Sequence, residues 1–259
     1  MKCKVCSSEC IPFSKALVLD KYDVQYFSCG NCGFIQTEEP YWLNEAYGDV
    51  IARSDLGLIH RNIRFSTICA SFIPIYFPKG RYLDFGGGNG MFVRMMRDRG
   101  FNFYWRDKLA DNQFAAGFEA VDEIEYSLLT ALELFEHLVK PLEEIEKMFS
   151  YSKNIFFSTR LIPQWHVEPS QWWYYALETG QHVSFYSRES LEVIARKFNV
   201  NLSSNGRSLH LLSKKRFPKA FLISLSFHPV SSLISTLLGI GRSSLLPDDY
   251  FNLTGKKLS

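Results

Sequence analysis

The residues best placed to do chemistry lie in a short glycine-rich segment, Arg81-Tyr-Leu-Asp-Phe-Gly-Gly-Gly-Asn-Gly90. An apolar run there includes the carboxylate Asp84, and glycines follow at positions 86, 87, 88 and 90. The run predicts a buried strand, and the periodic segment 91–99 predicts a helix. Glycine between them allows a sharp turn and lets a ligand approach the main chain closely. The segment therefore predicts a cofactor site, a glycine-rich turn without a ligand being the alternative.

The glycine spacing argues against two common cofactors. A dinucleotide loop needs G-x-G-x-x-G, but Met91 stands where a third glycine should follow Gly86 and Gly88. A phosphate-binding loop needs Gly-Lys-Ser/Thr at its end, which is missing after Gly90. What remains is D-x-G-x-G-x-G, which resembles motif I of the class I S-adenosylmethionine (SAM) methyltransferases. The resemblance implies that SAM is the cofactor and that the motif's acid, Asp84, and its three glycines belong to the binding loop.

A second acid follows the next predicted strand, 101–106. A carboxylate at this point can accept hydrogen bonds from both hydroxyls of a ribose. We therefore interpret Asp107 as the ribose ligand, a solvated acid at a helix start being the alternative. In this interpretation Asp84 orients the glycine loop through its backbone amides.

A third motif, Ala131-Leu-Glu-Leu-Phe-Glu-His-Leu-Val-Lys-Pro141, follows the predicted fourth strand. It groups Glu133, Glu136 and His137 beside the expected methyl group; we place the first with the cofactor and the other two with the catalytic residues. The stretch is similar to the E-x-x-E-H motif of many class I methyltransferases, including the ubiquinone-type O-methyltransferases. In that subgroup the three side chains bind a divalent metal, which the resemblance carries over to these residues. A helix cap with a buried histidine is the alternative for the Glu136-His137 pair.

The candidate general base is His182, in Gly180-Gln-His-Val-Ser-Phe-Tyr-Ser187. A histidine on the acceptor side can remove a proton because its pKa lies near working pH. The alternative is a histidine that only bonds a loop carbonyl, and His166 is a weaker second candidate. The aromatic stretch before His182 predicts a lid or pocket wall, or else packing under a long loop. Its residues are Trp165, Trp172, Trp173, Tyr174 and Tyr175.

Four of the six cysteines form two Cys-x-x-Cys pairs near the N-terminus. Each pair aims two thiolates at one point, and two pairs complete the tetrahedral four-sulfur site that zinc prefers. We predict a structural zinc in a ribbon, because four sulfurs leave no position for water. Its ligands are Cys3, Cys6, Cys29 and Cys32. A disulfide framework is disfavoured because the N-terminus lacks the apolar stretch of a signal peptide, so we expect a cytoplasmic protein.

Composition limits the partners. The net charge is only +2, from 29 basic and 27 acidic residues, so we expect neither nucleic acid nor an anionic membrane as a partner. The apolar segment 221–241 contains serines and Pro229, which would break a spanning helix. We interpret it as a packed helix or helix pair, an interfacial helix being the alternative. The oligomeric state is left open.

Strands and helices alternate through the middle of the chain, which predicts an α/β fold: a mostly parallel Rossmann-like sheet with helices on both faces. A turn at Asn205-Gly206 predicts an antiparallel hairpin at its edge. The predicted helices are 55–77, 91–99, 112–118, 140–149 and 187–198, and the predicted strands include 126–132 and 154–159, with a weak one near Val121. The predicted regions are a zinc ribbon (1–40), a linker and helical lead-in (41–78), the Rossmann-like domain (79–213) and a helical tail (214–259).

Residues 1–213 together resemble class I methyltransferases with an N-terminal zinc ribbon, including bacterial members of sugar and polysaccharide pathways. The resemblance implies methyl transfer to a small molecule, such as a nucleotide-linked sugar. Two other classes remain open: a zinc-ribbon interaction protein that does not catalyse, and a methyltransferase acting on RNA or protein. The intact acid and glycines argue against the first class, and the lack of a basic stripe argues against the second.

Overall fold

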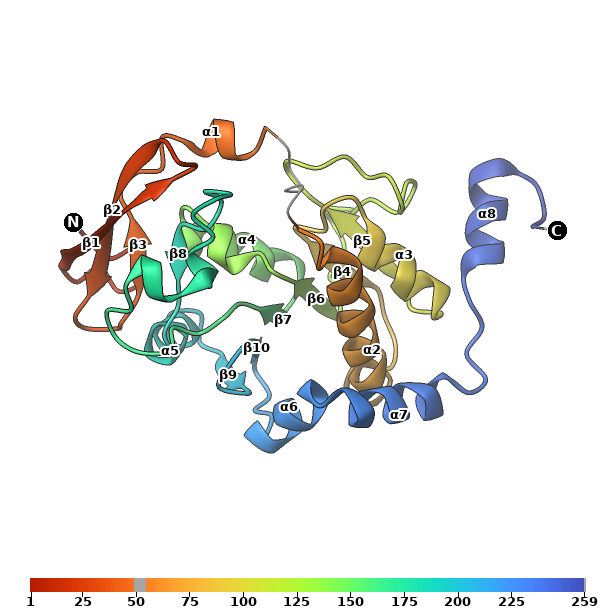
Figure 1. Ribbon diagram of the computed structural model, residues 1–259. Coiled ribbons are helices and arrows are strands. Elements are labelled where there is room, and N and C mark those ends of the chain that lie inside the picture. The colour runs from red at the N-terminus through yellow and green to blue at the C-terminus, as the bar shows by residue number, and fades with distance from the viewer. Residues whose placement is uncertain (49–54, 259) are drawn as a thin grey trace.

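A six-stranded sheet forms the centre of the molecule, with a smaller N-terminal sheet on one side and C-terminal helices along another (Figure 1). The computed structural model describes residues 1–48 and 55–258. Part of the predicted linker, 49–54, and the last residue of the predicted tail lie outside this range. The predicted α/β class, with an additional N-terminal antiparallel sheet, is confirmed.

The order of the main sheet is β5-β4-β6-β7-β10-β9. The first four strands are parallel, whereas β10 runs antiparallel to both β7 and β9. The predicted hairpin therefore forms the antiparallel edge. The strands are β4 (Tyr82–Phe85), β5 (Phe103–Arg106), β6 (Leu128–Ala131), β7 (Asn154–Ser158), β9 (Asn201–Ser204) and β10 (Leu209–Ser213).

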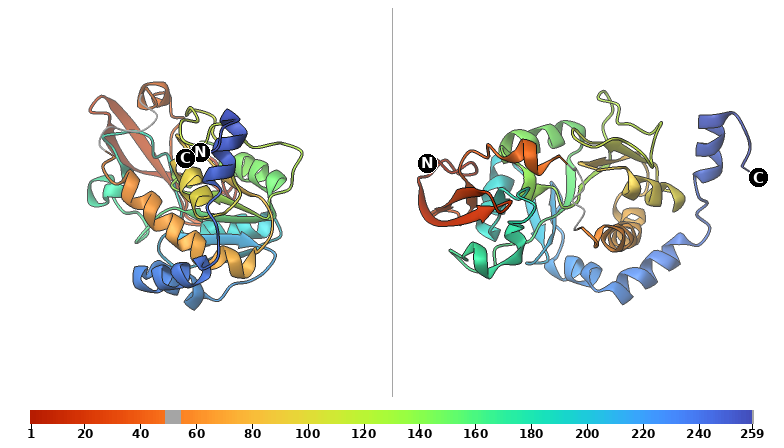
Figure 2. Two further views of the ribbon diagram at one scale, coloured as in Figure 1. Left: turned by 90° about the vertical axis from the view of Figure 1, so that its right-hand side faces the viewer. Right: turned by 45° about the horizontal axis from the view of Figure 1, so that its top comes forward.

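Helices cover both faces of this sheet (Figure 2). Successive side chains of a strand point to opposite faces, so β4 contributes Leu83 to one core and Tyr82 to the other. One core lies beneath α4 (Pro141–Tyr151) and α5 (Arg188–Lys197). The other lies beneath α2 (Leu58–Tyr76), α3 (Met91–Asp98) and α6 (Lys219–Ser226). Burial on both faces explains why the central strands β4, β6 and β7 are predominantly apolar.

The segment after β5 departs from the prediction. Residues 112–118, all of which the structure describes, form no helix. The amides of Gln113 and Phe114 instead donate to the carbonyl of Asn89, and the side chain of Asn112 accepts from a neighbouring amide. These bonds tie the segment to the glycine loop and replace helical ones. The weak strand predicted near Val121 is reduced to one parallel bridge, between Trp105 and Glu119.

The N-terminal sheet has the order β1-β2-β3-β8. Its first three strands are β1 (Cys10–Val18), β2 (Tyr22–Cys29) and β3 (Ile35–Thr37), followed by the short helix α1 (Leu43–Ala46). The fourth strand, β8 (Ser184–Phe185), comes from far along the chain and pairs with β3. The N-terminal segment is thereby bonded to the stretch that carries His182.

The tail forms α6, α7 (His228–Gly239) and α8 (Leu246–Thr254). Pro229 stands at the start of α7, where it interrupts no helical hydrogen bond, so the segment is the helix pair that the sequence suggests. Among the described residues no single helix is long and apolar enough to cross a membrane. The pair α6 and α7 meets that criterion jointly but bends by 91° between the helices.

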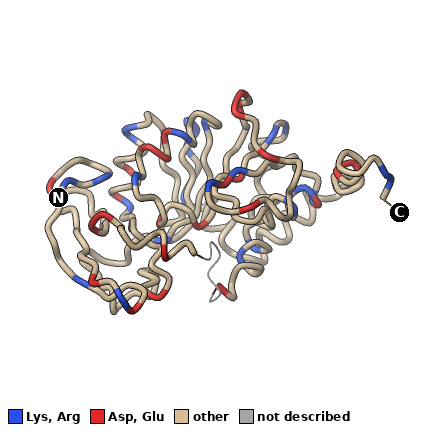
Figure 3. Tube along the Cα trace, turned by 90° about the horizontal axis from the view of Figure 1, so that it is seen from above, with Lys and Arg blue, Asp and Glu red and all other residues tan. Residues whose placement is uncertain are grey.

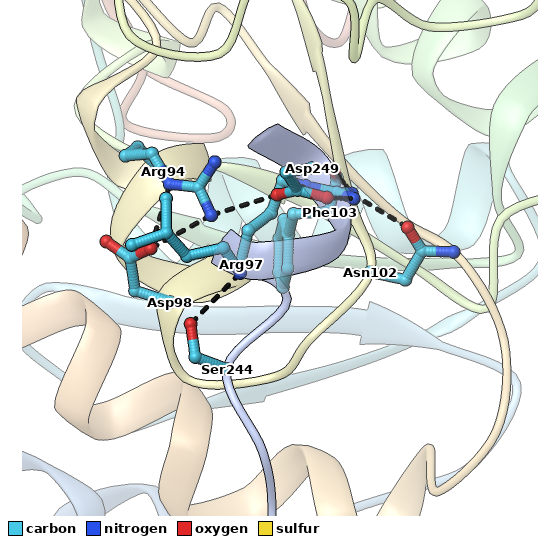
Figure 4. A network of polar contacts seen from close by, with 8 residues as sticks. Arg94, Arg97, Asp98, Asn102, Phe103, Ser244 and Asp249 are labelled. Carbon is cyan, nitrogen blue, oxygen red and sulfur yellow. Dashed lines mark hydrogen bonds and ion pairs between the residues drawn. The ribbon is translucent and has the colours of Figure 1, made fainter. Parts of the chain in front are cut away.

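A buried ion pair fastens α8 to α3 (Figure 4). The Asp249 carboxylate accepts from Nε and Nη2 of Arg97 at 2.8 and 2.6 Å, and Arg94 Nη2 lies 2.9 Å away as a second cation. Arg97 also donates to Asn102 and to the carbonyl of Phe103. The tail thus reaches back to the main domain, but Asp249 does not line the cavity described below.

Asp249→Ala should lower the free energy of unfolding by about 3–5 kcal/mol, because it leaves the Arg97 guanidinium buried without its carboxylate. Urea unfolding followed by circular dichroism measures the loss. Asp248→Ala is the matched control, since its side chain is exposed on the same helix. Equal stability of the two variants would show that the buried pair does not hold the tail.

Candidate active site

A cavity of about 420 Å³ lies beside the carboxyl ends of β4 and β6. In an open α/β sheet this is where ligands bind, since the strand order reverses there. The charged part of the lining is one arginine, Arg61, against five carboxylates among the described residues: Asp55, Asp84, Glu133, Glu136 and Glu178. This surplus of negative charge favours a ligand that carries positive charge.

The glycine loop forms one wall of the cavity. Gly86, Gly88 and Gly90 have φ angles of 74°, 54° and 87°, which side-chain-bearing residues adopt only with strain. A Cβ on Gly87 would lie 2.9 Å from Asp84 Oδ2, so the loop could not keep this shape with a larger residue. Beside Gly88 there is open space, so a ligand can approach the loop closely there, although the Gly88 amide and carbonyl are already hydrogen-bonded within the protein. The loop therefore fits the role that its sequence predicts.

Asp84 lies at the base of the cavity. Its side chain is almost fully buried, and Thr130 Oγ1 donates a hydrogen bond of 2.6 Å to Asp84 Oδ1. Burial raises the pKa of Asp84 to about 7, against the opposing effect of that hydrogen bond. A positively charged ligand nearby would favour the ionised form.

Asp107 braces the glycine loop from the neighbouring strand. Its Oδ2 accepts from the Gly88 amide at 2.9 Å, and Oδ1 accepts from the amides of Leu109 and Ala110. The carbonyl of Gly88 in turn accepts from the Trp105 indole at 2.8 Å. Asp107 is not among the residues that line the cavity. Its place one strand from the loop is as expected, and its contact with a ribose stays a prediction.

Glu133 follows β6 in a left-handed conformation, with φ of 51°. Ser158, at the end of β7, accepts from the Glu133 amide at 2.8 Å and donates to its carboxylate. Burial, and then the nearby Glu136, raise the pKa of Glu133. Its carboxylate is thus already bonded within the protein while it lines the cavity.

Glu136, His137 and His182 come together at the other end of the cavity, with ligand atoms within 4.8 Å of one another. The sequence indicated Glu133, Glu136 and His137 as the possible metal ligands. In the structure, His182 takes the place of Glu133 in this group. Glu136 is fully buried, and neither carboxylate oxygen has a hydrogen-bond partner within the ranges 1–48 and 55–258. Burial raises the pKa of Glu136 to about 7. An unpartnered buried carboxylate is costly, which favours a ligand or ion opposite it.

The two histidines differ in their partners. His182 Nδ1 lies 2.6 Å from the carbonyl of Tyr174, so Nδ1 carries the hydrogen and the lone pair is on Nε2. His137 Nδ1 lies 3.0 Å from the Tyr47 hydroxyl. Burial lowers the pKa of both side chains, which keeps them neutral. His182 therefore does bond a loop carbonyl, which is part of the alternative interpretation given above. The bond uses Nδ1, so Nε2 stays available as a base or a metal ligand. His166 is exposed and packs against Phe13 outside the cavity.

The aromatic stretch divides between both predicted roles. Trp173 and Tyr174, both in the 3₁₀ turn Trp173–Tyr175, line the cavity. Trp172 and Tyr175 pack in a core beneath β1 and β2 instead, and Trp165 is half exposed. The short turns Phe135–His137 and Pro169–Gln171 complete this region.

Sequence reasoning missed the contribution of α2 to the site. Arg61, Asn62 and Phe65 of this helix line the cavity opposite the glycine loop. Arg61 is paired with Asp55, with Nη1 and Oδ1 2.7 Å apart. The neighbouring polar residues Arg61 and Asn62, in a helix that is otherwise mostly apolar, were the available signal in the sequence. Only the fold shows that this face of the helix meets the cavity.

Residues 60–205 match a family described as a methyltransferase domain. The chain belongs to this methyltransferase family. The match covers more than half of the chain and includes the glycine loop, the E-x-x-E-H motif and His182. No curated protein matches the sequence. The motif I residues, the site at the strand ends and the family agree on a class I SAM-dependent methyltransferase domain.

A solved structure agrees with this fold. An O-methyltransferase family protein from Burkholderia thailandensis superposes with a TM-score of 0.51 and 11% identity, over 70% of this chain and 65% of that one. An O-methyltransferase family 2 protein from Planctomyces limnophilus gives a TM-score of 0.45 and 16% identity, over 67% and 65%. The present chain thus spans less than two thirds of the length of either protein. At these identities the likeness concerns the fold alone.

The four-cysteine cluster lies in the N-terminal sheet, outside the residues that match the family. The Sγ atoms of Cys3 and Cys32 are 3.7 Å apart, and those of Cys6 and Cys29 are 3.4 Å apart. Zn–S bonds near 2.3 Å in a tetrahedron place sulfurs about 3.8 Å apart, so the four thiols fit zinc. All four ligand atoms lie within 4.8 Å of one another, and the cysteines are free thiols. Cys10 is buried nearby but lies outside the four-cysteine group.

Proposed function

We propose that the protein transfers the methyl group of SAM to a small-molecule acceptor, with His182 as general base. The observation that carries this proposal is that one cavity joins the glycine loop to His182. SAM supplies an electrophilic methyl group, and proximity within a closed site accounts for most of the expected rate enhancement.

The glycine-loop end of the cavity would hold the cofactor. Gly88 leaves room for the cofactor beside the main chain, while Asp84 and the other acids favour its sulfonium charge. Arg61 is the one arginine of the described lining, so it is the side chain suited to the carboxylate of the cofactor's methionine part. Asp107 would keep the loop in its binding shape.

The His182 end would hold the acceptor. Nε2 of the neutral ring can take a proton from a hydroxyl or carbon acid as the methyl group arrives. Glu136 lies close enough to stabilise the imidazolium that forms, and Trp173 and Tyr174 would exclude water. Following the resemblance to sugar-pathway methyltransferases, we propose a nucleotide-linked sugar or polysaccharide precursor as the acceptor.

A second candidate is an O-methyltransferase with a divalent metal in the same cavity. The observation that favours it is the unpartnered Glu136 carboxylate, grouped with His137 and His182. One carboxylate and two imidazoles suit a divalent transition metal. In this case His182 Nε2 would bind the metal and would not serve as the base. The metal would orient the acceptor's oxygen and lower its pKa.

Calorimetry with SAM tests the proposal without knowledge of the acceptor. The wild-type protein should bind SAM, and Asp107→Ala should weaken binding about 10- to 100-fold, since the variant loses the charged hydrogen bond to the Gly88 amide of the loop. Asp111→Ala, an exposed acid four residues along, is the matched control and should bind like wild type. Wild-type protein that does not bind SAM would refute the proposed function, whereas unchanged binding by Asp107→Ala would refute only the role of that residue.

A further inference from the structure

Helix α7, at the lower edge of Figure 1, buries serines and exposes leucines, whereas α6 buries Leu222 and Leu225 in the usual way. In α7 the buried positions are serines, Ser231 and Ser235, which face α2 and the end of α3; Arg99 donates to Ser235 Oγ at 3.1 Å. The exposed positions are Leu233, Leu237 and, just past the helix, Ile240. A surface helix normally shows the opposite distribution.

The exposed apolar residues form a continuous stripe. Leu233, Leu237 and Ile240 follow the spacing i, i+4, i+7, which places them on one side of a helix, and they are 62%, 58% and 77% exposed. Phe227 at the bend and Ile223 in α6 are also exposed. Both views in Figure 2 place α6 and α7 at the periphery of the molecule, with α2 on their inner side. The described part of the chain does not cover this stripe.

The part of the sequence that contains the stripe carries charge of one sign. Segment 193–247 contains no aspartate or glutamate, although the whole chain has nearly as many acids as bases. Elsewhere Lys and Arg are interspersed with Asp and Glu along the chain, as Figure 3 shows. The basic residues of the segment are Arg196, Lys197, Arg207, Lys214, Lys215, Arg216, Lys219 and Arg242. The small net charge of the whole chain therefore conceals a strongly basic region.

A second, more open cavity of about 740 Å³ lies next to the start of α6. Its charged lining includes Arg196, Arg216 and Lys219, for which the structure has no acidic partner among the described residues. A fourth cation, Arg188, is paired with the single acid of the lining, Glu192, at 2.9 Å. Arginine and lysine side chains around a hollow are suited to phosphate groups.

We propose that α6 and α7 bind the surface of an anionic membrane. The apolar stripe would enter the headgroup boundary, and the basic residues beside α6 would contact lipid phosphates, with the cavity holding one headgroup. Exposed Leu and Ile next to Lys and Arg is the composition of helices that lie in a membrane interface. A second copy of the chain could cover the apolar stripe, but two copies would bring the basic regions together, which charge repulsion opposes.

Vesicle flotation of the full chain at physiological salt tests the proposal. The protein should float with vesicles of phosphatidylcholine mixed with phosphatidylglycerol and remain behind with phosphatidylcholine alone. Lys215→Glu with Lys219→Glu should weaken binding by roughly fivefold or more for each charge. Leu233→Ser with Leu237→Ser should abolish it, and both double variants change exposed side chains only.

Two matched controls keep the result specific. Leu17→Ser removes a similarly exposed leucine from β1, and Lys15→Glu reverses an exposed charge on the same strand; both should bind like wild type. Equal binding to neutral vesicles, or binding unaffected by the double variants, would overturn the proposal. A dimer in light scattering that Leu233→Ser with Leu237→Ser dissociates, without vesicle binding, would assign the stripe to a second copy. Inorganic phosphate binding without vesicle binding would assign the cavity to a soluble ligand, which also overturns the proposal.

Discussion

Replacing His182 with alanine should lower the rate of methyl transfer by about 10²- to 10⁴-fold while leaving the affinity for SAM unchanged. The large effect is expected because the hydrogen bond from Nδ1 to the Tyr174 carbonyl fixes the tautomer and presents the Nε2 lone pair to the cavity. Burial lowers the pKa of the ring, so the basic form is already present at neutral pH. Alanine removes the proton acceptor but leaves the glycine loop intact.

The assay is transfer of radiolabelled methyl from SAM to candidate acceptors, paired with calorimetry for SAM affinity. His166→Ala is the matched control, since this histidine is exposed and lies outside the cavity. A His182→Ala variant that retains the wild-type rate would remove the residue from the mechanism. Loss of SAM affinity together with the rate would indicate a binding role and contradict the assignment as base.

Metal analysis separates the general base from the metal-dependent alternative. If His182 acts only as a base, the protein should contain no divalent ion beyond the one held by the four cysteines. If Glu136, His137 and His182 bind a metal, a second ion should be present and should be lost in Glu136→Gln. Glutamine keeps the shape of the side chain but removes its charge. Loss of the second ion from this variant would therefore show that the Glu136 carboxylate binds it.

Features set by short stretches of sequence were predictable. The apolar run to Phe85, the glycines after it and the helix from Met91 are neighbours in the chain, and the structure shows β4, a tight loop and α3 there. The two Cys-x-x-Cys pairs likewise needed only local spacing to predict a common site. In each case the signal depended on backbone conformation or ligand spacing within a few residues.

Features that depend on distant contacts were not predictable. The family resemblance already placed His182 and Glu136 in one active site, but their direct grouping arises because the chain returns to the end of β6 after β7. Arg61 enters the cavity only because α2 packs beside the glycine loop. The segment 112–118 has a helical pattern, but the carbonyl of Asn89 captures two of its amides. The buried pair of Arg97 and Asp249 joins residues 152 positions apart. No local periodicity encodes such pairs.

Hydrogen bonds couple the N-terminal sheet to the active site. Ser187 Oγ, at the start of α5, donates to the carbonyl of Cys32 at 2.6 Å. The Thr37 amide donates to the carbonyl of Val183, whose own amide donates to the carbonyl of Glu136. Val183 directly follows His182, so disorder in β3 would reach both sides of the histidine and glutamate cluster.

Cys32→Ala should therefore eliminate the bound zinc, unfold the N-terminal sheet and also reduce methyl transfer. Structural zinc sites contribute about 10–16 kcal/mol in small zinc-finger peptides, so loss of one ligand removes more stability than the small sheet itself can supply. Native mass spectrometry reports the zinc, hydrogen exchange reports the protection of β1 to β3, and the methyl-transfer assay reports the coupling.

Cys10→Ala is the matched control, because Cys10 is buried in the same sheet but lies outside the four-cysteine group. Zinc retained by Cys32→Ala and lost by Cys10→Ala would contradict the ligand assignment. Full methyl transfer by zinc-free protein would show instead that the sheet is independent of the site, despite the bonds through Thr37 and Val183.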